Sequence, residues 1–130
     1  MRMEIRILSR ITILLVVLCS VFIFTSCQQE TSITGKWRTA AGNCIEFTEE
    51  GRWYGVAKDG TEPFDFGDYT LDGKLLTFHT DSESEGCKDH TGKYNVDISD
   101  EGKITFKLIE DECSGRGVDL SQSPFGKCEP

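Results

Sequence analysis

Residues 94–108, Tyr-Asn-Val-Asp-Ile-Ser-Asp-Glu-Gly-Lys-Ile-Thr-Phe-Lys-Leu, carry the pattern that decides the fold. Apolar and polar residues alternate over 94–98 and again over 104–108, and this period of two is typical of a strand with one buried face. Between the two runs lies Glu101-Gly102, and an acidic-glycine pair supplies the positive φ that a tight hairpin turn needs. The stretch therefore predicts two antiparallel strands joined directly, because so short a connection cannot link parallel neighbours.

The same alternation recurs along the chain, separated by the pairs Glu50-Gly51, Asp59-Gly60 and Asp72-Gly73. A change of parity beyond Phe66 indicates a β-bulge at Gly67. No segment shows a convincing helical period. We expect strands near 35–39, 43–48, 52–58, 63–71, 74–80, 91–99 and 103–110, a weak last strand near 116–120, and one longer loop over 81–90.

These elements predict an all-β domain, an antiparallel up-and-down meander of seven or eight strands. A meander with one apolar face buries it by folding into a sandwich or by closing into a small barrel, and closure also removes exposed strand edges. We favour the barrel. The side chains expected to point inward are Ile45, Phe47, Tyr54, Phe64, Phe66, Leu76, Phe78, Tyr94, Val96, Ile98, Ile104, Phe106 and Leu108.

The interior of such a barrel has two possible states. Eight strands enclose a space that side chains just fill, or that holds one small ligand. Because the inward side chains are large, we favour a filled core. An open interior would use Phe64, Phe66, Phe78, Tyr94 and Phe106 as its ligand-binding set.

Residues 1–26 have the pattern of a signal peptide. Three arginines precede an apolar run over 11–24, which is shorter than the roughly 20 residues of a membrane-spanning helix. The following Phe24-Thr25-Ser26-Cys27 resembles the bacterial lipobox. That resemblance implies that Cys27 is acylated and becomes the mature N-terminus, with 27–33 as a tether and 34–130 as the domain. The alternative is an ordinary secreted chain with an unmodified cysteine.

Charge excludes some classes of partner. The chain has a net charge of −8, and removal of 1–26 takes away three arginines and one glutamate, which brings the net charge to −10. A domain this acidic is repelled by nucleic acids and by anionic lipid surfaces. We therefore expect no nucleic-acid partner, and contact with the bilayer only through the acyl chains on Cys27.

Four cysteines remain in the mature chain, and an even number in an exported protein favours two disulfides. Cys87 and Cys113 would face each other at the far end of the 91–110 hairpin, and Cys44 and Cys128 then pair by elimination. The other two connectivities stay open. A zinc site is disfavoured because the chain has only two histidines and no C-x-x-C pair. We expect no metal and no cofactor.

Catalytic patterns are weak. His79 has the parity of an outward side chain, His90 lies in the acidic loop, and no Ser-His-Asp order or nucleophile elbow is present. The oxygen-rich stretch 81–86 could wrap a Ca²⁺ ion, but its acidic residues do not have EF-hand spacing. We therefore interpret it as a solvated loop. The sequence indicates a binding protein rather than an enzyme.

Gly35-Lys36-Trp37, at the start of the meander, resembles the Gly-x-Trp motif of the lipocalins. The resemblance covers about 35–116 and implies that Trp37 plugs one barrel end, with Arg116 packed across its ring. The chain lacks the middle lipocalin motif and shows no C-terminal helix in its pattern. Together with the lipobox, the resemblance is to small lipocalin-like lipoproteins of bacteria. It implies a non-enzymatic protein anchored in the cell envelope on the exported side of the membrane. Its partner would be a small apolar molecule or an envelope component; the alternative is a protein-interaction or inhibitor module.

Overall fold

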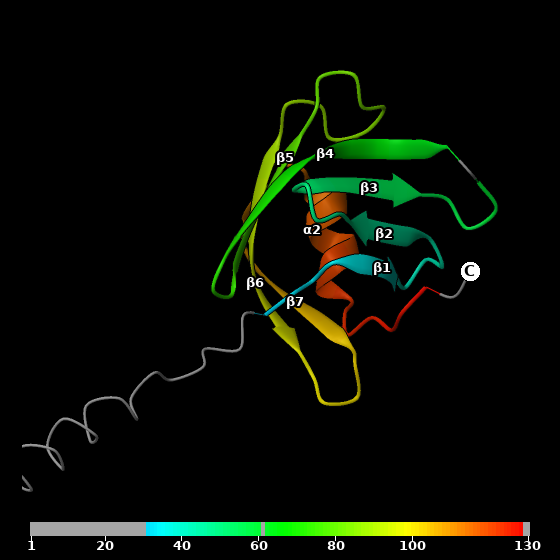
Figure 1. Cartoon of the computed structure of the whole chain (residues 1–130). Helices are drawn as coiled ribbons and strands as arrows, with labels where there is room; N and C mark the ends of the chain where they lie inside the picture. The colour runs from blue at the N-terminus through cyan, green and yellow to red at the C-terminus, as the bar shows by residue number, and fades with distance from the viewer. Residues whose placement is uncertain (1–30, 61, 129–130) are drawn as a thin grey trace, which may run out of the picture.

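The computed structural model of the chain describes residues 31–60 and 62–128 (Figure 1). The signal peptide over 1–26 and the acylation of Cys27 lie outside these residues and remain predictions. The described chain forms one antiparallel sheet whose strand order is the order of the sequence, followed by one short helix. The elements are β1 (Gly35–Arg38), β2 (Cys44–Phe47), β3 (Arg52–Val56), β4 (Pro63–Asp72), β5 (Leu75–Thr80), β6 (Thr91–Ile98), β7 (Ile104–Asp111) and α2 (Ser114–Ser121).

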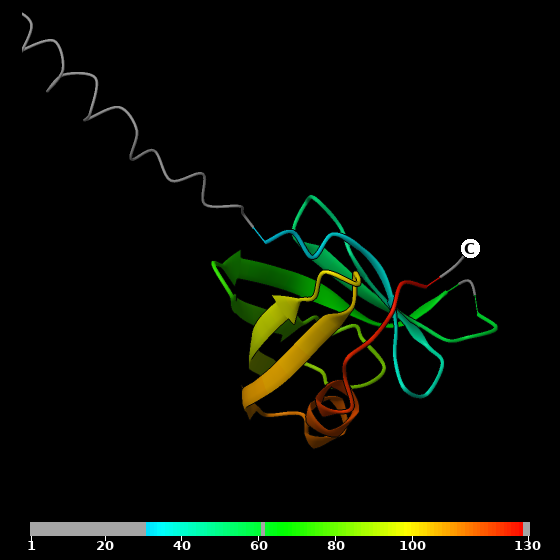
Figure 2. The ribbon, with the colours of Figure 1, turned by 90° about the horizontal axis from the view of Figure 1, so that it is seen from below.

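The predicted fold class is confirmed: the seven strands form an up-and-down meander that curls into a half-barrel. The C-terminal segment 125–128 bridges its two edge strands. Phe125 and Ile104 of β7 exchange backbone hydrogen bonds of 2.8 and 2.9 Å, and the amide of Arg38 in β1 donates to the carbonyl of Gly126 at 2.9 Å. Figure 2 shows this red segment between cyan β1 and orange β7. The segment thereby pairs with β1 and with the first residue of β7, which reduces the exposed strand edge.

The predicted last strand over 116–120 is wrong, because this stretch is the helix α2. Its buried residues are Arg116, Gly117 and Leu120, a spacing that a helix and not a strand brings to one face. A short helix with two glycines has little intrinsic stability, so its packing against the sheet stabilises it. The segment that follows the helix, 125–128, makes the backbone contacts with β1 and β7.

Aromatic rings fill most of the interior. Phe47 lies 5.0 Å from Tyr69 and 5.6 Å from Phe78, measured between ring centroids. Tyr94 lies 5.6 Å from Phe78 and 6.2 Å from Phe106, both edge to face. Edge-to-face pairs add about 0.5–1.5 kcal/mol each beyond the area they bury. These rings close the middle of the barrel.

Four members of the expected inward set do not lie in the core: Tyr54, Phe64, Phe66 and Leu108. In β3 the buried residues are Trp53 and Gly55, so Tyr54 lies on the outer face, where it pairs with Phe66 of β4. The prediction had to choose between two adjacent aromatics, and pairing with Phe47 of β2 places Trp53 inward.

Leu108 of β7 is also misplaced by the prediction, since 48% of it is exposed. The β6–β7 register shifts between Lys93 and Tyr94, so that Tyr94 pairs with Leu108 and Lys93 with Glu110. Ile109 is the extra residue of this bulge. Leu108 comes before this bulge and keeps the parity of its buried partner Tyr94, so its exposure reflects the position of β7 at the edge of the sheet.

Gly67 is not the site of a bulge. It pairs regularly with Trp53 on one side and Thr80 on the other, and the register shift lies opposite Gly55 and Val56. A Cβ at position 67 would collide with the carbonyl oxygen of His79. The glycine therefore permits a close approach of β4 and β5 on the inner face.

The meander separates two ends of the barrel. At the turn end lie residues 31–34, which lead into β1, and the short turns after β2, β4 and β6. At the loop end lie the connections 39–43, 57–62 and 81–90, together with α2 and both disulfides. Among the residues described, no helix is both long enough and apolar enough to cross a membrane.

Candidate functional site

A pocket of about 300 Å³ opens at the loop end, between the strands β2–β4, the 81–90 loop and α2. Its apolar wall consists of Ile45 from β2, Trp53 from β3, Phe64 from β4 and Leu120 from α2. Glycines from β3, the loop and the helix leave it open. The lining residues are Thr39, Asn43, Cys44, Ile45, Trp53, Gly55, Phe64, Asp65, Gly86, Cys87, Cys113, Gly115, Arg116, Asp119 and Leu120.

The 81–90 loop is held against β4 and forms one wall. Asp65 accepts hydrogen bonds from the hydroxyl of Ser84 and, at 2.8 Å, from the amide of Gly86. The amide of Glu85 donates to the carbonyl of Phe64 at 3.1 Å. The disulfide from Cys87 ties the far side of the loop to the start of α2. Although it carries many charges, the loop is therefore fixed at both its ends and its middle.

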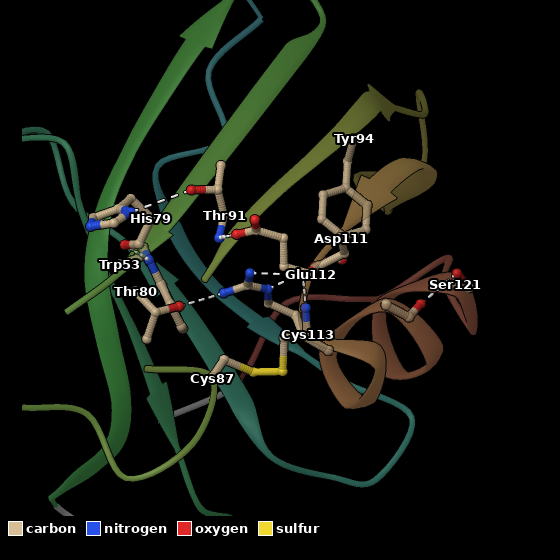
Figure 3. Close-up of polar contacts among 12 residues, drawn as sticks. Trp53, His79, Thr80, Cys87, Thr91, Tyr94, Asp111, Glu112, Cys113 and Ser121 are labelled. Carbon is tan, nitrogen blue, oxygen red and sulfur yellow. Dashed lines mark hydrogen bonds and ion pairs between the residues drawn. A yellow bond between two sulfur atoms is a disulfide. The ribbon is translucent and has the colours of Figure 1, made fainter. Parts of the chain in front are cut away.

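A buried ion pair borders the pocket through Arg116, which is one of the lining residues. Arg116 of α2 donates to both carboxylate oxygens of Asp111, at 2.8 and 2.9 Å, and to the hydroxyl of Thr80 at 2.5 Å. Its guanidinium carbon lies 5.4 Å from the ring centroid of Phe78 and 5.8 Å from that of Trp53. Figure 3 labels the two partners of this guanidinium, Thr80 and Asp111, and the nearby Cys87–Cys113 disulfide. A bidentate pair of this kind fixes the helix on the sheet.

The opposite charges of Arg116 and Asp111 cancel. Burial acts to raise the pKa of Asp111, but hydrogen bonds from Arg116, the Tyr94 hydroxyl and the Cys113 amide outweigh it and hold the pKa below its usual value. Burial, and then the bond to Asp111, raises the pKa of Tyr94. A Cβ at Gly92 would collide with the Asp111 carboxylate, so this glycine makes room for the pair. The cluster is a structural support, with every buried polar atom among the described side chains hydrogen-bonded.

The structure brings only one of the five predicted ligand-binding residues to the pocket. Phe64 lines it, while Phe66 lies on the outer face. Phe78, Tyr94 and Phe106 are buried among other rings and do not line this pocket. Sequence reasoning missed Trp53, and also Asp65, whose acidic side chain at an inward position broke the apolar alternation of β4.

The motif at Gly35 and Trp37 has a different partner from the expected one. Gly35 adopts a φ of 121°, which disfavours other residues, and the indole of Trp37 is buried and donates to the carbonyl of Ile33 at 2.8 Å. The ammonium of Lys127 lies 3.5 Å from the Trp37 ring centroid. The prediction that Arg116 stacks on Trp37 is wrong, because α2 carries Arg116 to Trp53 and Phe78 while the C-terminal segment carries Lys127 to Trp37.

The predicted cysteine pairing is confirmed. Cys87 and Cys113 are joined, with Cα atoms 5.4 Å apart, and Cys44 is joined to Cys128 across 6.1 Å. The second bond fastens the C-terminal segment to the start of β2 at the pocket rim. His79 is exposed, as its parity predicts.

The pocket combines an apolar wall with a few polar groups. In the part of the chain that the structure describes, no group of three His, Cys, Asp or Glu side chains is placed to hold a metal ion. Comparisons of the chain with protein-family models, with curated proteins and with solved structures find no match.

Proposed function

We propose that this chain is a lipid-anchored protein of the bacterial cell envelope that binds a small, largely apolar molecule and catalyses no reaction. The observation that carries the proposal is the pocket of about 300 Å³ beside α2. Ligand sites in proteins start at about this volume and combine apolar walls with a few placed polar groups. Aromatic rings fill the middle of the barrel, so the ligand occupies the loop end and not a deep central cup.

The proposed location follows from three features. Two disulfides are typical of an exported, oxidising compartment. The lipobox at 24–27 would supply the anchor, and two or more acyl chains give stable attachment. Residues 31–34 lie at the turn end, so a tether starting at Cys27 would direct the pocket away from the bilayer. Mass spectrometry of the membrane fraction tests this: the mature N-terminus is expected at Cys27 with acyl chains, and an unmodified Cys27 would refute the anchor.

The pocket itself is tested by filling it. Gly115→Leu places an isobutyl group where an added Cβ meets nothing within 4 Å, on a wall of the pocket. Leucine also favours a helix over glycine by up to about 0.8 kcal/mol, so the variant stays folded. Val118→Leu, on the exposed side of the same helix, is the matched control.

The assay is the fluorescence of phenylnaphthylamine, a neutral apolar probe, with the full chain in phosphatidylcholine nanodiscs and empty nanodiscs subtracted. We expect Gly115→Leu to weaken binding at least about tenfold, the equivalent of 1.4 kcal/mol. Val118→Leu should bind as the original chain does. Equal binding by all three chains, or none by the original, would refute the pocket as the ligand site.

A second candidate is a protein-interaction or inhibitor module, and exposed apolar side chains favour it. Leu108, Ile109 and Val118 are 48%, 50% and 63% exposed. Leu108 lies beside α2, where a Cβ on Gly117 would be 3.7 Å from its methyl groups. Leu108→Glu should abolish chemical cross-linking to an envelope protein in intact cells if this surface binds one. Unchanged cross-linking would reject the surface.

A further inference from the structure

The pocket contains three charged side chains, and only two of them are left to act on a ligand. Arg116 is 7% exposed in its side chain, and its charge is matched by the bidentate bond to Asp111. Asp65 and Asp119 also line the pocket. Within the described residues neither carboxylate takes part in a salt bridge, since the seven ion pairs there involve other groups. The pocket is therefore an apolar wall with an excess of negative charge.

Asp65 has one oxygen to spare. The hydrogen bonds from Ser84 and Gly86 both reach Oδ1. Oδ2 lies beside Gly86, where a Cβ would collide with it, and among the described side-chain contacts it takes no hydrogen bond. Asp119 projects from the exposed side of α2 at the rim. One carboxylate thus lies inside the pocket and one at its entrance.

Acidic residues around the entrance add to the negative charge of the pocket. The 81–90 loop carries Asp81, Glu83, Glu85 and Asp89 against the single lysine Lys88, and it forms a pocket wall through Gly86 and Cys87. Arg52 pairs with Asp81 and cancels one of these charges. The remaining acids, on a chain of net charge −8, attract cations and repel anions.

Resting on the proposed function, we propose that the ligand is a cationic amphiphile: a short apolar body that contacts Ile45, Trp53 and Phe64, with one ammonium group between Asp65 and Asp119. An ammonium is matched by carboxylates at both the inside and the rim. An anionic amphiphile such as a fatty acid would meet the same two carboxylates with no free cation in the lining, because Arg116 is already paired.

Three probes with the same apolar chain and different charge test this: octyltrimethylammonium, octanol and octanoate. Each competes with phenylnaphthylamine on the full chain in phosphatidylcholine nanodiscs. The Gly115→Leu variant, in which the pocket is filled, measures the fluorescence that does not come from the pocket. We expect octyltrimethylammonium to displace the fluorophore at a concentration about tenfold lower than octanoate, since each partly exposed charge pair contributes a modest amount. The preference should shrink at high salt.

Asp119→Asn is expected to weaken the cationic probe about threefold and leave octanol unchanged. The control is Asp72→Asn, which removes the same charge at the turn end and keeps an Asx-Gly turn. Octanol or octanoate binding as tightly as the cation would overturn the charge assignment while the pocket stands. Failure of all three probes, with no pocket signal from the fluorophore itself, would refute the proposed function. An Asp119→Asn variant with the original cation preference would overturn the role given to the pocket carboxylates.

Discussion

Arg116→Met removes the guanidinium from under the pocket and leaves the Asp111 carboxylate, whose side chain is 1% exposed, without its cation. Two charge-assisted hydrogen bonds, at 2.8 and 2.9 Å, are lost together with the bond to Thr80. Breaking one partner of a buried pair typically costs about 3–5 kcal/mol. Because Asp111 keeps its bonds from the Tyr94 hydroxyl and the Cys113 amide, we expect a loss near the lower end, about 3 kcal/mol.

Urea unfolding followed by circular dichroism, with both disulfides intact, measures this loss. Arg116→Lys should fall between the two chains, because lysine keeps the charge and not the fork of donors. The matched control is Lys93→Met, which breaks the Lys93–Glu110 pair on the neighbouring rungs of β6 and β7. That pair is exposed, so its loss should be far smaller. A loss below about 1 kcal/mol in Arg116→Met would refute the view that this pair holds α2 to the sheet.

Acid adds a second readout for the same pair. The folded-state pKa of Asp111 lies below its unfolded value of about 3.9. The stabilisation is therefore complete above the unfolded pKa and is lost as the pH falls through the folded pKa. Arg116→Met removes the largest contribution that lowers this pKa. We expect the variant to lose less stability than the original chain between neutral pH and acid, and equal losses would contradict the assignment.

Three further predictions rest on the same structure. Replacing Cys44 and Cys128 by serine should cost more than replacing Cys87 and Cys113, about 4.6 against about 3.5 kcal/mol for sequence separations of 84 and 26, and urea midpoints in the reverse order would contradict the assigned bonds. Gly67→Ala should cost about 3 kcal/mol because its Cβ meets the β5 backbone, whereas Gly126→Ala meets nothing within 4 Å; thermal melts that rank them equally would exclude the close approach. Because the folded pKa of Tyr94 is raised, its contribution to stability is complete below the unfolded pKa of about 10 and declines above it, which Tyr94→Phe should abolish in unfolding experiments at alkaline pH.

The strands and their order follow from the sequence because both depend on local chemistry. Alternation of apolar residues needs only the geometry of an extended chain, and the acidic-glycine pairs at 50–51, 72–73 and 101–102 mark turns that allow one neighbour alone. The pairing of Cys87 with Cys113 follows from the same hairpin, since its register is nearly constant along the two strands. Each of these inferences uses residues that are close in sequence or joined by one turn.

The errors lie where two faces of a strand compete. Trp53 and Tyr54 are adjacent aromatics, and either satisfies the pattern; only pairing with Phe47, whose face is already inward, decides between them. Leu108 keeps the inward parity of its partner Tyr94, but it lies on the edge strand β7 and is 48% exposed. Whether a position with inward parity is buried depends on its place in the sheet and on what packs against it, and both come from residues elsewhere in the chain.

The pocket depends on tertiary structure throughout. The sequence around Arg116 predicts a strand, and in the structure this stretch is the helix α2, from which the guanidinium reaches Asp111, Thr80 and the rings of Phe78 and Trp53. Burying such a charge is favourable only when its partners are already in place, and those partners come from three separate strands. The sequence by itself determined a disulfide-bonded antiparallel meander. Long-range pairing decided which parts of the interior are filled and which are open. From the sequence alone a charged residue is expected at the surface, and only the tertiary structure shows the counter-ion that allows it to be buried.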